Sequence, residues 1–202
     1  MTFTAPVLEY SLLAPILIVL GGALVGVLIE AFAPRKLRAA SQLLIALLTL
    51  VIALVALISV RGRVSTTAAM SAVTFDGAGV ILQGTILVIA IISLFLIADN
   101  ESFTASAAAL PGSIEERESL QAEAKTTEVF PLTLFAVAGM MLFPIASDLI
   151  TLFVALEVLS LPLYLMSGLS RRRRLLSQEA ALKYFLLGAF ASAFFRFGVA
   201  FI

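Results

Sequence analysis

The sequence contains no cysteine and no histidine. Without thiolates or imidazoles, the chain cannot hold a thiolate-ligated iron–sulfur cluster, ligate haem through histidine, build a structural zinc site or carry out thiol redox chemistry. Any electron transfer linked to it must run through other polypeptides. Charge is scarce as well. The 13 Lys and Arg residues cancel the 13 Asp and Glu residues, so no global charge points to nucleic acid.

Apolar residues dominate what is present. They make up 61% of the 202 residues, and the mean hydropathy is +1.13. A soluble domain of this size cannot cover that much apolar surface. The charged residues are confined to short blocks between apolar runs, as is typical of a chain that passes alternately through bilayer and water. The sequence therefore predicts a polytopic membrane protein.

Six apolar segments are long enough, at roughly 17–25 residues, to cross a bilayer as helices. They are continuous and do not alternate polar with apolar residues, which excludes barrel strands. The segments cover residues 12–32, 39–60, 79–98, 129–146, 148–169 and 179–202. We expect an all-α bundle of about six transmembrane helices. Residues 1–98 hold the first three, residues 99–128 form an acidic cytoplasmic loop, and residues 129–202 hold the last three.

The basic residues predict the orientation of this bundle. Cytoplasmic loops carry an excess of Lys and Arg. Nine basic residues follow the first, third and fifth segments, against Arg61 and Arg63 on the other side: Arg35, Lys36, Arg38, Arg117, Lys125, Arg171, Arg172, Arg173 and Arg174. We therefore expect the N-terminus outside the cell. A patch for anionic lipid or nucleic acid is the alternative interpretation of the four consecutive arginines.

The acidic loop at residues 99–128 is too polar for the bilayer and too long for a tight turn. Ser113 and Glu116 have the spacing of a capping box, which predicts a short surface helix over residues 113–124. A solvated loop is the simplest interpretation, and a docking surface for a partner subunit is the alternative.

Glu157 is the residue that an anchoring helix would not need. It lies near the middle of the fifth segment, where an acid costs on the order of 2.5–3.5 kcal/mol. We expect a functional site there, with a cationic or protonatable partner in the bundle. The alternative is a glutamate that stays permanently protonated or paired and fixes helix packing. Ser160 and Tyr164 share its helix face, and Pro162 frees a backbone carbonyl nearby that water could occupy. Asp148, by contrast, fits the role of a helix cap.

Two cations lie in the sixth segment. Lys183 follows Glu179 by four residues, the favourable order for an ion pair within a helix, so pairing or snorkelling competes with a role in a proton relay. Arg196 approaches the outer boundary and points to nearly the opposite face, so we place it outside the site. In the first segment, Glu30 lies close to Arg35 and Lys36, which predicts an interfacial ion pair.

Several stretches resemble a known family. They are EVFPLTLF from Glu128, GMML from Gly139, SDLITLFVALEVLSLPLY from Ser147 and EAALKYFLLGAFAS from Glu179. They are similar to the antiporter-like membrane subunits of respiratory complex I, the NADH:quinone oxidoreductase, and most of all to subunit N. The resemblance is strong from about residue 128 onward and looser before it.

The resemblance implies a proton-translocating subunit that couples quinone reduction elsewhere in the complex to proton pumping through buried Glu and Lys residues. Glu157 matches the glutamate of the family's proton path, and Lys183 matches the lysine on the following helix. It further implies other membrane-arm subunits and the bilayer as partners, no nucleic acid, and the plasma membrane of a bacterium. This chain would carry no cofactor, while quinone, FMN and iron–sulfur clusters would belong to partner subunits. A subunit of a multisubunit cation/proton antiporter is the alternative function, and a purely structural scaffold is a third.

The sequence departs from the family in two respects. Family members continue into a further helix repeat, so we expect this chain to be a fragment of a longer polypeptide or a split gene product. An apolar residue normally stands where this chain has Arg196.

Overall fold

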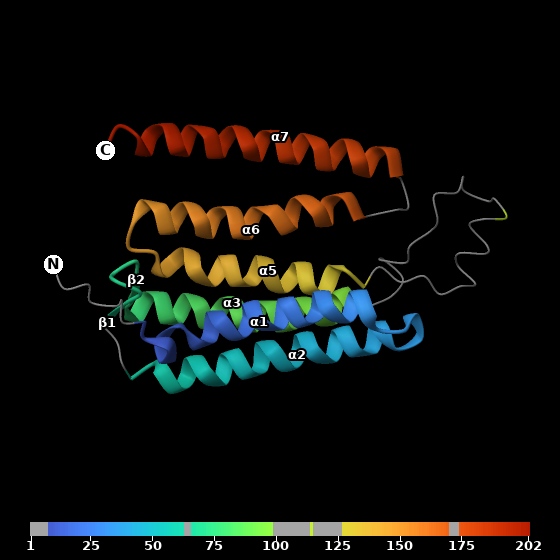
Figure 1. Cartoon of the computed structure of the whole chain (residues 1–202), viewed down its shortest axis with the longest axis horizontal. Coiled ribbons are helices and arrows are strands. Elements are labelled where there is room, and N and C mark those ends of the chain that lie inside the picture. The colour runs from blue at the N-terminus through green and yellow to red at the C-terminus, as the bar shows by residue number, and fades with distance from the viewer. Residues whose placement is uncertain (1–7, 63–65, 99–113, 115–126, 170–173) are drawn as a thin grey trace.

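The computed structural model describes residues 8–62, 66–98, 114, 127–169 and 174–202. These residues form helices that lie side by side with their long axes aligned (Figure 1). The elements are α1 (Tyr10–Phe32), α2 (Arg35–Val60), strands β1 (Thr66–Ala68) and β2 (Val73–Phe75), α3 (Gly77–Ala98), α5 (Val129–Leu142), the 3₁₀ turn η1 (Phe143–Ile145), α6 (Leu149–Leu169) and α7 (Arg174–Val199). The surface helix expected at residues 113–124 lies outside the described residues, apart from residue 114.

The helical membrane architecture predicted from the sequence is confirmed. Within the described ranges, five helical stretches are long and apolar enough to cross a membrane: Tyr10–Phe32, Leu37–Val60, Gly77–Ala98, Leu149–Leu169 and Ser177–Val199. The fourth predicted segment differs, because α5 ends at Leu142 and passes into the turn η1. Pro144 has no N–H to donate and its ring crowds the preceding turn, which favours the end of the regular helix here. Together α5 and η1 form an apolar stretch that is shorter than the five others.

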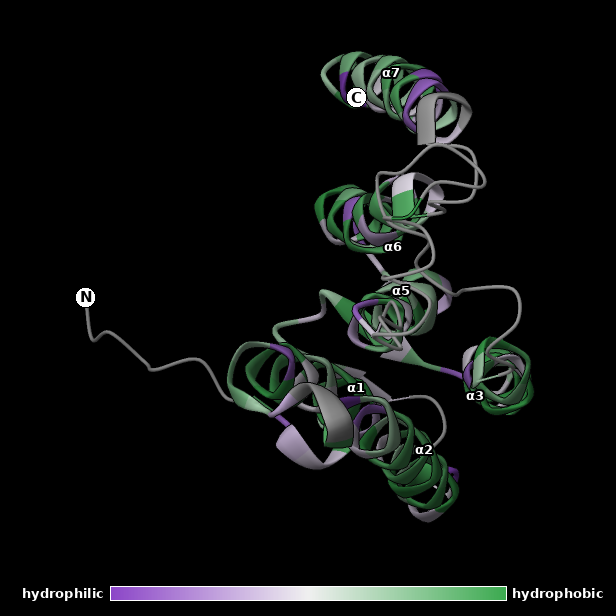
Figure 2. Ribbon diagram, turned by 90° about the vertical axis from the view of Figure 1, so that its right-hand side faces the viewer, coloured by the Kyte–Doolittle hydropathy of each residue, from purple (hydrophilic) through white to green (hydrophobic). Residues whose placement is uncertain are grey.

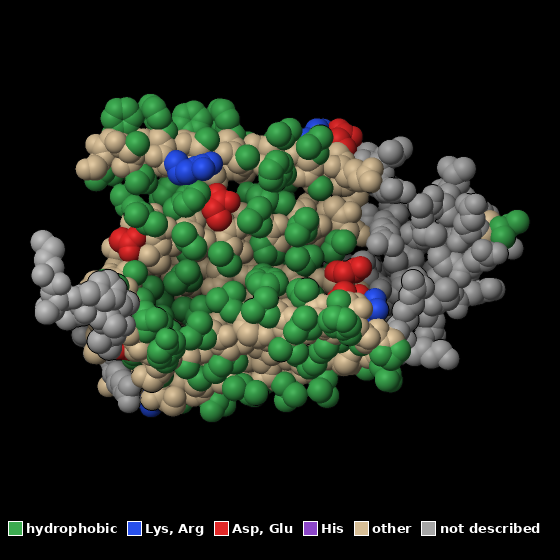
Figure 3. All heavy atoms as spheres, in the orientation of Figure 1, with side chains coloured by type: hydrophobic (Ala, Val, Ile, Leu, Met, Phe, Trp, Pro, Cys, Tyr) green, Lys and Arg blue, Asp and Glu red, His purple; other side chains and the backbone are tan. Residues whose placement is uncertain are grey.

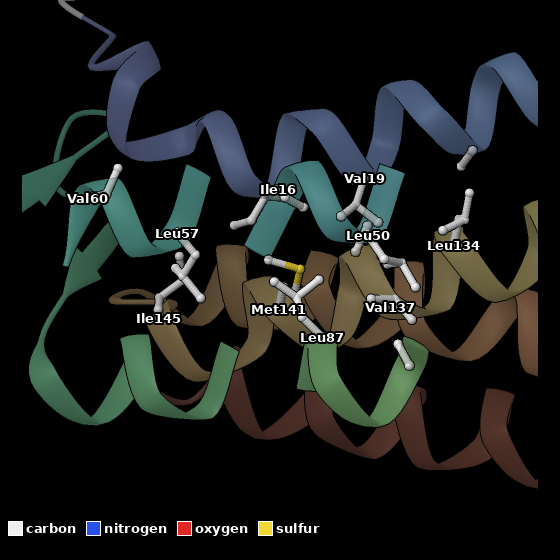
Figure 4. Close-up of a cluster of buried hydrophobic side chains, with 14 of the residues drawn as sticks. Ile16, Val19, Leu50, Leu57, Val60, Leu87, Leu134, Val137, Met141 and Ile145 are labelled. Atoms are coloured by element: carbon white, nitrogen blue, oxygen red, sulfur yellow. The ribbon is translucent and has the colours of Figure 1, made fainter. Parts of the chain in front are cut away.

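The hydrophobic core lies among α1, α2, α3 and α5. Figure 4 shows Ile16 and Val19 of α1 meeting Leu50 of α2, Leu87 of α3 and Met141 of α5. All five side chains are buried. Lipid tails are as apolar as leucine, so such a core holds its helices together mainly by close van der Waals packing. The helices α6 and α7 stand outside this core.

A β-hairpin between α2 and α3 was not predicted. Strands β1 and β2 pair antiparallel, with Thr66 opposite Phe75. The loop between them holds three consecutive residues, Ala69, Met70 and Ser71, in the left-handed region. Left-handed backbone usually calls for Gly or Asn, neither of which stands in this loop. The sequence therefore lacks the ordinary signal for this turn.

The hairpin also touches the connection between α5 and α6. Val73 forms an isolated β-bridge with Ala146. The backbone N–H of Ser147 donates to the carbonyl of Ala72 at 2.9 Å. At the other side, the carboxylate of Glu9 accepts from the N–H of Ala69 at 3.2 Å. The hairpin thus links the start of α1 to the start of α6.

Candidate functional site

Helix α6, which carries Glu157, lies between two other helices. Figure 2 shows α5, α6 and α7 in a row with α6 in the middle. The helix α7 packs mainly against α6. A helix in this position presents one face to each neighbour, so the face on which Glu157 lies decides which helix it meets.

The face of α6 toward α5 is closely packed. A side chain at Gly139 of α5 would overlap the backbone of Leu159. The main chains of α5 and α6 are therefore in close contact at this glycine. Ala155 is fully buried on this face. The hydroxyl of Thr133 on α5 donates to the sulfur of Met166 at 3.6 Å. Ala155, Leu159 and Met166 follow one another at helical spacing, which marks this stripe as the α5 side.

The opposite face of α6 meets α7 through aromatic contacts. The ring of Tyr164 lies edge-on to Tyr184 and Phe185, with centroid distances of 4.8 and 5.7 Å. Gly188 leaves the room that the hydroxyl of Tyr164 occupies. Three turns earlier on α6, Phe153 stacks on Phe195 with centroids 6.0 Å apart. These contacts mark the α7 side of α6.

Glu157 lies on the α7 side. It follows Phe153 by four residues and precedes Tyr164 by seven, so all three share one helix face. Its side chain is half-buried. It stands about 12 Å from the start of a helix about 30 Å long, close to its middle. Within the described residues no ion pair reaches its carboxylate.

The two neighbours expected to serve Glu157 make other contacts. The hydroxyl of Ser160 donates to the backbone carbonyl of Leu156 at 2.6 Å and not to the carboxylate. Tyr164 is held by aromatic rings of α7, as described above. Pro162 is accommodated inside α6, which is assigned as one helix from Leu149 to Leu169.

Asp148 caps α6, as the sequence predicted. Its carboxylate accepts from the backbone N–H of Thr151 at 2.7 Å and from the hydroxyl of the same residue at 2.8 Å. The backbone bond first, and the hydroxyl bond second, hold the pKa of Asp148 below its usual value. The carboxylate is therefore charged at neutral pH, and it stands at the helix end that attracts negative charge.

Lys183 forms the predicted ion pair with Glu179. The ammonium lies 2.6 Å from the carboxylate, and 73% of the Lys183 side chain is exposed. The expected burial of Lys183 is not seen among the described residues, and its role in proton transfer stays a prediction. Lys183 and Glu157 are not brought together.

Arg196 was placed outside the site, and the structure puts it beside the site. Its guanidinium carbon lies 5.2 Å from the centroid of the Phe153 ring, over the ring face. The nearly opposite orientation from Lys183 was predicted correctly, but on this helix it is the direction that faces α6. The spacing of α7 alone could not reveal this, because it does not say which face meets α6.

Comparison with known proteins gives the relation of this chain to a family. Residues 146–202 match the family described as NADH:quinone oxidoreductase/Mrp antiporter, transmembrane. Over 98% of its length the chain is 59% identical to NADH-quinone oxidoreductase subunit N of Acidothermus cellulolyticus and 52% identical to the Rhodococcus opacus protein of the same name. Over nearly its whole length the chain is therefore similar to subunit N. It spans 39% and 41% of the length of those two relatives.

A solved structure is also similar to this chain. A chain of the structure titled respiratory complex I from Thermus thermophilus with bound aureothin superposes with a TM-score of 0.66 at 28% identity. The match covers 92% of this chain and 35% of that one. The likeness to subunit N therefore includes residues before 128, where the sequence motifs are looser.

A polar cluster in this subunit N relative was only partly predicted. Glu30 forms an ion pair with Arg38 at 2.8 Å. The side chains of Arg35 and Lys36, the expected partners, lie outside the described part of the chain. The other carboxylate oxygen accepts from Gln42 at 3.0 Å and from Thr127 at 2.7 Å. The cluster ties α1 to α2 and to the residue two positions before α5.

A second buried polar contact was missed altogether. Gln83 of α3 is fully buried, and its amide nitrogen donates to the carbonyl of Met141 in α5 at 2.9 Å. Its amide oxygen is buried and has no partner among the described residues. A glutamine within an apolar run is the signal that could have found it.

Proposed function

We propose that this chain forms part of a proton-translocating subunit in the membrane arm of NADH:quinone oxidoreductase. The observation that carries the proposal is the position of Glu157, an acid at mid-helix on the face of α6 that meets α7. The names and the overall likeness of the relatives support the same assignment. The electrons travel in partner subunits, where FMN, iron–sulfur clusters and quinone belong.

In this proposal the chain acts by electrostatics. Burial disfavours a charged carboxylate and a nearby cation favours it. A change of charge in a neighbouring subunit, passed along the membrane arm, alters this balance at Glu157 and drives uptake and release of its proton. Lys183, near the opposite end of α7 from Arg196, is the candidate for passing protons between Glu157 and the cytoplasmic side.

We further propose that the chain lies in the plasma membrane of a bacterium with its N-terminus outside, in contact with other membrane-arm subunits and with lipid. The apolar helices and the bacterial relatives support the location. The excess of basic residues after the first, third and fifth segments supports the orientation.

The test replaces the carboxyl group of Glu157. Inverted membrane vesicles that carry the assembled enzyme with Glu157→Gln are expected to pump protons at a rate lower by about tenfold or more, because a positioned proton carrier contributes on the order of 10²–10⁴-fold. Proton uptake is followed by a pH-sensitive dye, and NADH oxidation is measured in parallel. The matched control is Asp148→Asn, which removes an acid from the start of the same helix but keeps a capping oxygen.

Unchanged proton stoichiometry in the Glu157→Gln enzyme would remove Glu157 from the mechanism and favour the structural scaffold. A subunit of a cation/proton antiporter is the rival function, since the description of the matching family names the Mrp antiporter as well. Purification of a tagged chain separates the two. Recovery of flavin and iron–sulfur subunits with it supports the oxidoreductase, and their absence from an intact membrane complex supports the antiporter.

A further inference from the structure

Arg196 of α7 contacts Phe153, which lies about one helical turn from Glu157 on α6. Its guanidinium carbon is 5.2 Å from the centre of the Phe153 ring. Phe153 and Glu157 are four residues apart on α6, a spacing that places them on the same face about 6 Å apart along the axis. On the face shown in Figure 3, a Lys or Arg side chain of α7 lies beside an Asp or Glu side chain of α6.

The antiparallel register of α6 and α7 leads to the same place. Contacts pair Phe153 with Phe195 and Tyr164 with Tyr184 and Phe185. Because the helices are antiparallel, each step forward along α6 from Phe153 corresponds to one step back along α7 from Phe195. Glu157 therefore lies opposite residues 191–192 of α7. Ser192 is only 5% exposed on a helix that is otherwise largely exposed, so it faces α6.

The position of Ser192 distinguishes Arg196 from Lys183. Arg196 follows Ser192 by four residues, about 6 Å along the axis and about 40° around it. Lys183 precedes Ser192 by nine residues, about 13 Å along the axis and about 180° around it. Arg196 therefore lies on the α6-facing side of α7, about one helical turn from Glu157 along the axis, whereas Lys183 points to the opposite side and lies more than two turns away.

The other groups around this face add little charge of their own. Helix α5 and the turn η1, which also pack against α6, contain no titratable residue. Lys183 and Glu179 of α7 are paired with each other, and Tyr184 packs on Tyr164. Arg196 is thus the charged group of α7 that the geometry offers to Glu157.

We propose that Arg196 is a positioning residue for Glu157, held beside it by the ring of Phe153, and that its guanidinium is the positive charge that α7 presents to this carboxylate. The proposal deepens the proposed function, because it names the cation that acts on the same acid. An arginine stays charged at every pH of interest. The effect of Arg196 on Glu157 therefore depends on the distance between the two side chains and not on loss of a proton by the arginine. Movement of α7 relative to α6 changes that distance.

Infrared spectroscopy of the assembled enzyme in lipid bilayers tests this without turnover. The protonated carboxyl band of Glu157 is identified by its loss in Glu157→Gln. In Arg196→Gln this band is expected to persist to a pH higher by about one unit or more, because an adjacent cation shifts a carboxylate by about one to three units. Arg196→Lys retains the charge and is expected to restore most of the parental titration.

Two results overturn the inference. The band in Arg196→Gln can titrate as in the parent, or Lys183→Gln can move it while Arg196→Gln does not, which would make Lys183 the partner. Both results are independent of the pumping test. If Glu157→Gln stops pumping and Arg196→Gln leaves the band in place, the proposed function stands and this inference falls. If Glu157→Gln pumps protons like the parent but the band moves in Arg196→Gln, this inference stands and the proposed function falls.

Discussion

Single side chains join helices that are far apart in the sequence. The carboxylate of Glu30 in α1 accepts three hydrogen bonds, from Arg38, Gln42 and Thr127. Gln42 is 1% exposed and Thr127 is 4% exposed, so both depend on the protein for partners. Gln42 also donates to the carbonyl of Gly26 at 2.8 Å. One acid therefore satisfies the polar groups of two other segments.

Replacing Glu30 by Ala is expected to lower the free energy of unfolding by about 1–3 kcal/mol, because buried donors lose their acceptor. Glu30→Gln keeps one acceptor oxygen and is expected to cost less. Thermal unfolding in detergent micelles, followed by circular dichroism, measures both. Equal losses in the two variants would mean that the charge alone matters, and no loss in Glu30→Ala would show that the cluster does not stabilise the bundle.

At this scale, sequence reasoning succeeded where partners share one helix. The pair of Glu179 and Lys183 follows from helical spacing alone, and the structure confirms it. Glu30 was correctly expected to pair, but the pair with Arg38 joins two helices, and helical spacing cannot say which cation after Pro34 faces Glu30. The position of Arg196 beside α6 was missed for the same reason. Spacing within one helix does not show which of its faces packs against the neighbouring helix. The roles of Glu157 and Lys183 in proton transfer stay predictions.

Among the elements, α6 has one closely packed face and one aromatic face. Gly139 makes the packed face possible, because the space for its side chain is already taken by main-chain atoms of Leu159 and Val158. Main chain cannot rotate away as a flexible side chain can. The distance between α5 and α6 therefore depends on this glycine.

A pair of matched substitutions tests this dependence. In a helix, Gly→Ala normally stabilises by about 0.5–1 kcal/mol. Gly21→Ala in α1 is expected to follow that rule, because nothing lies within 4 Å of the added methyl group. Gly139→Ala is expected to destabilise by about 1–3 kcal/mol, as overpacking does. The measurement is the unfolding free energy in micelles, and stabilisation by both substitutions would contradict the close α5–α6 contact.

The existence and approximate ends of the long helices could be predicted from apolar length, since the bilayer sets that length. Two local features could not. Pro144 divides the fourth apolar segment into α5 and η1, although its composition alone indicates one continuous span. The hairpin loop has three residues in the left-handed region and none of them is glycine, so the sequence contains no residue that predicts this turn.

For the whole molecule, the family could be predicted from motifs in its second half, and the comparisons extend the relation to 98% of the chain. The orientation of the bundle rests on the distribution of basic residues. The absence of cysteine makes that prediction simple to test, because each introduced cysteine is the one thiol in the chain.

Two single-cysteine variants at opposite ends of α2 report the orientation. Gly62→Cys is expected to react with a membrane-impermeant maleimide in intact cells, because the proposed orientation places it on the outer side. Ala33→Cys is expected to react only after the membrane is opened, since the same orientation places it on the cytoplasmic side. Labelling is read as a mass increase of the purified chain. The reverse pattern would place the N-terminus in the cytoplasm.

The small hairpin after α2 has a mechanical consequence for the acid in α6. Its bond from Ser147 to Ala72 and its bridge from Val73 to Ala146 fasten the segment just ahead of α6 to the first half of the chain. A helix held at its N-terminal end can tilt only about that end. Displacement of α6 is then least beside Asp148, intermediate at Glu157 and greatest toward Leu169, so a small tilt at the far end reaches the carboxylate as a much smaller, finely graded shift.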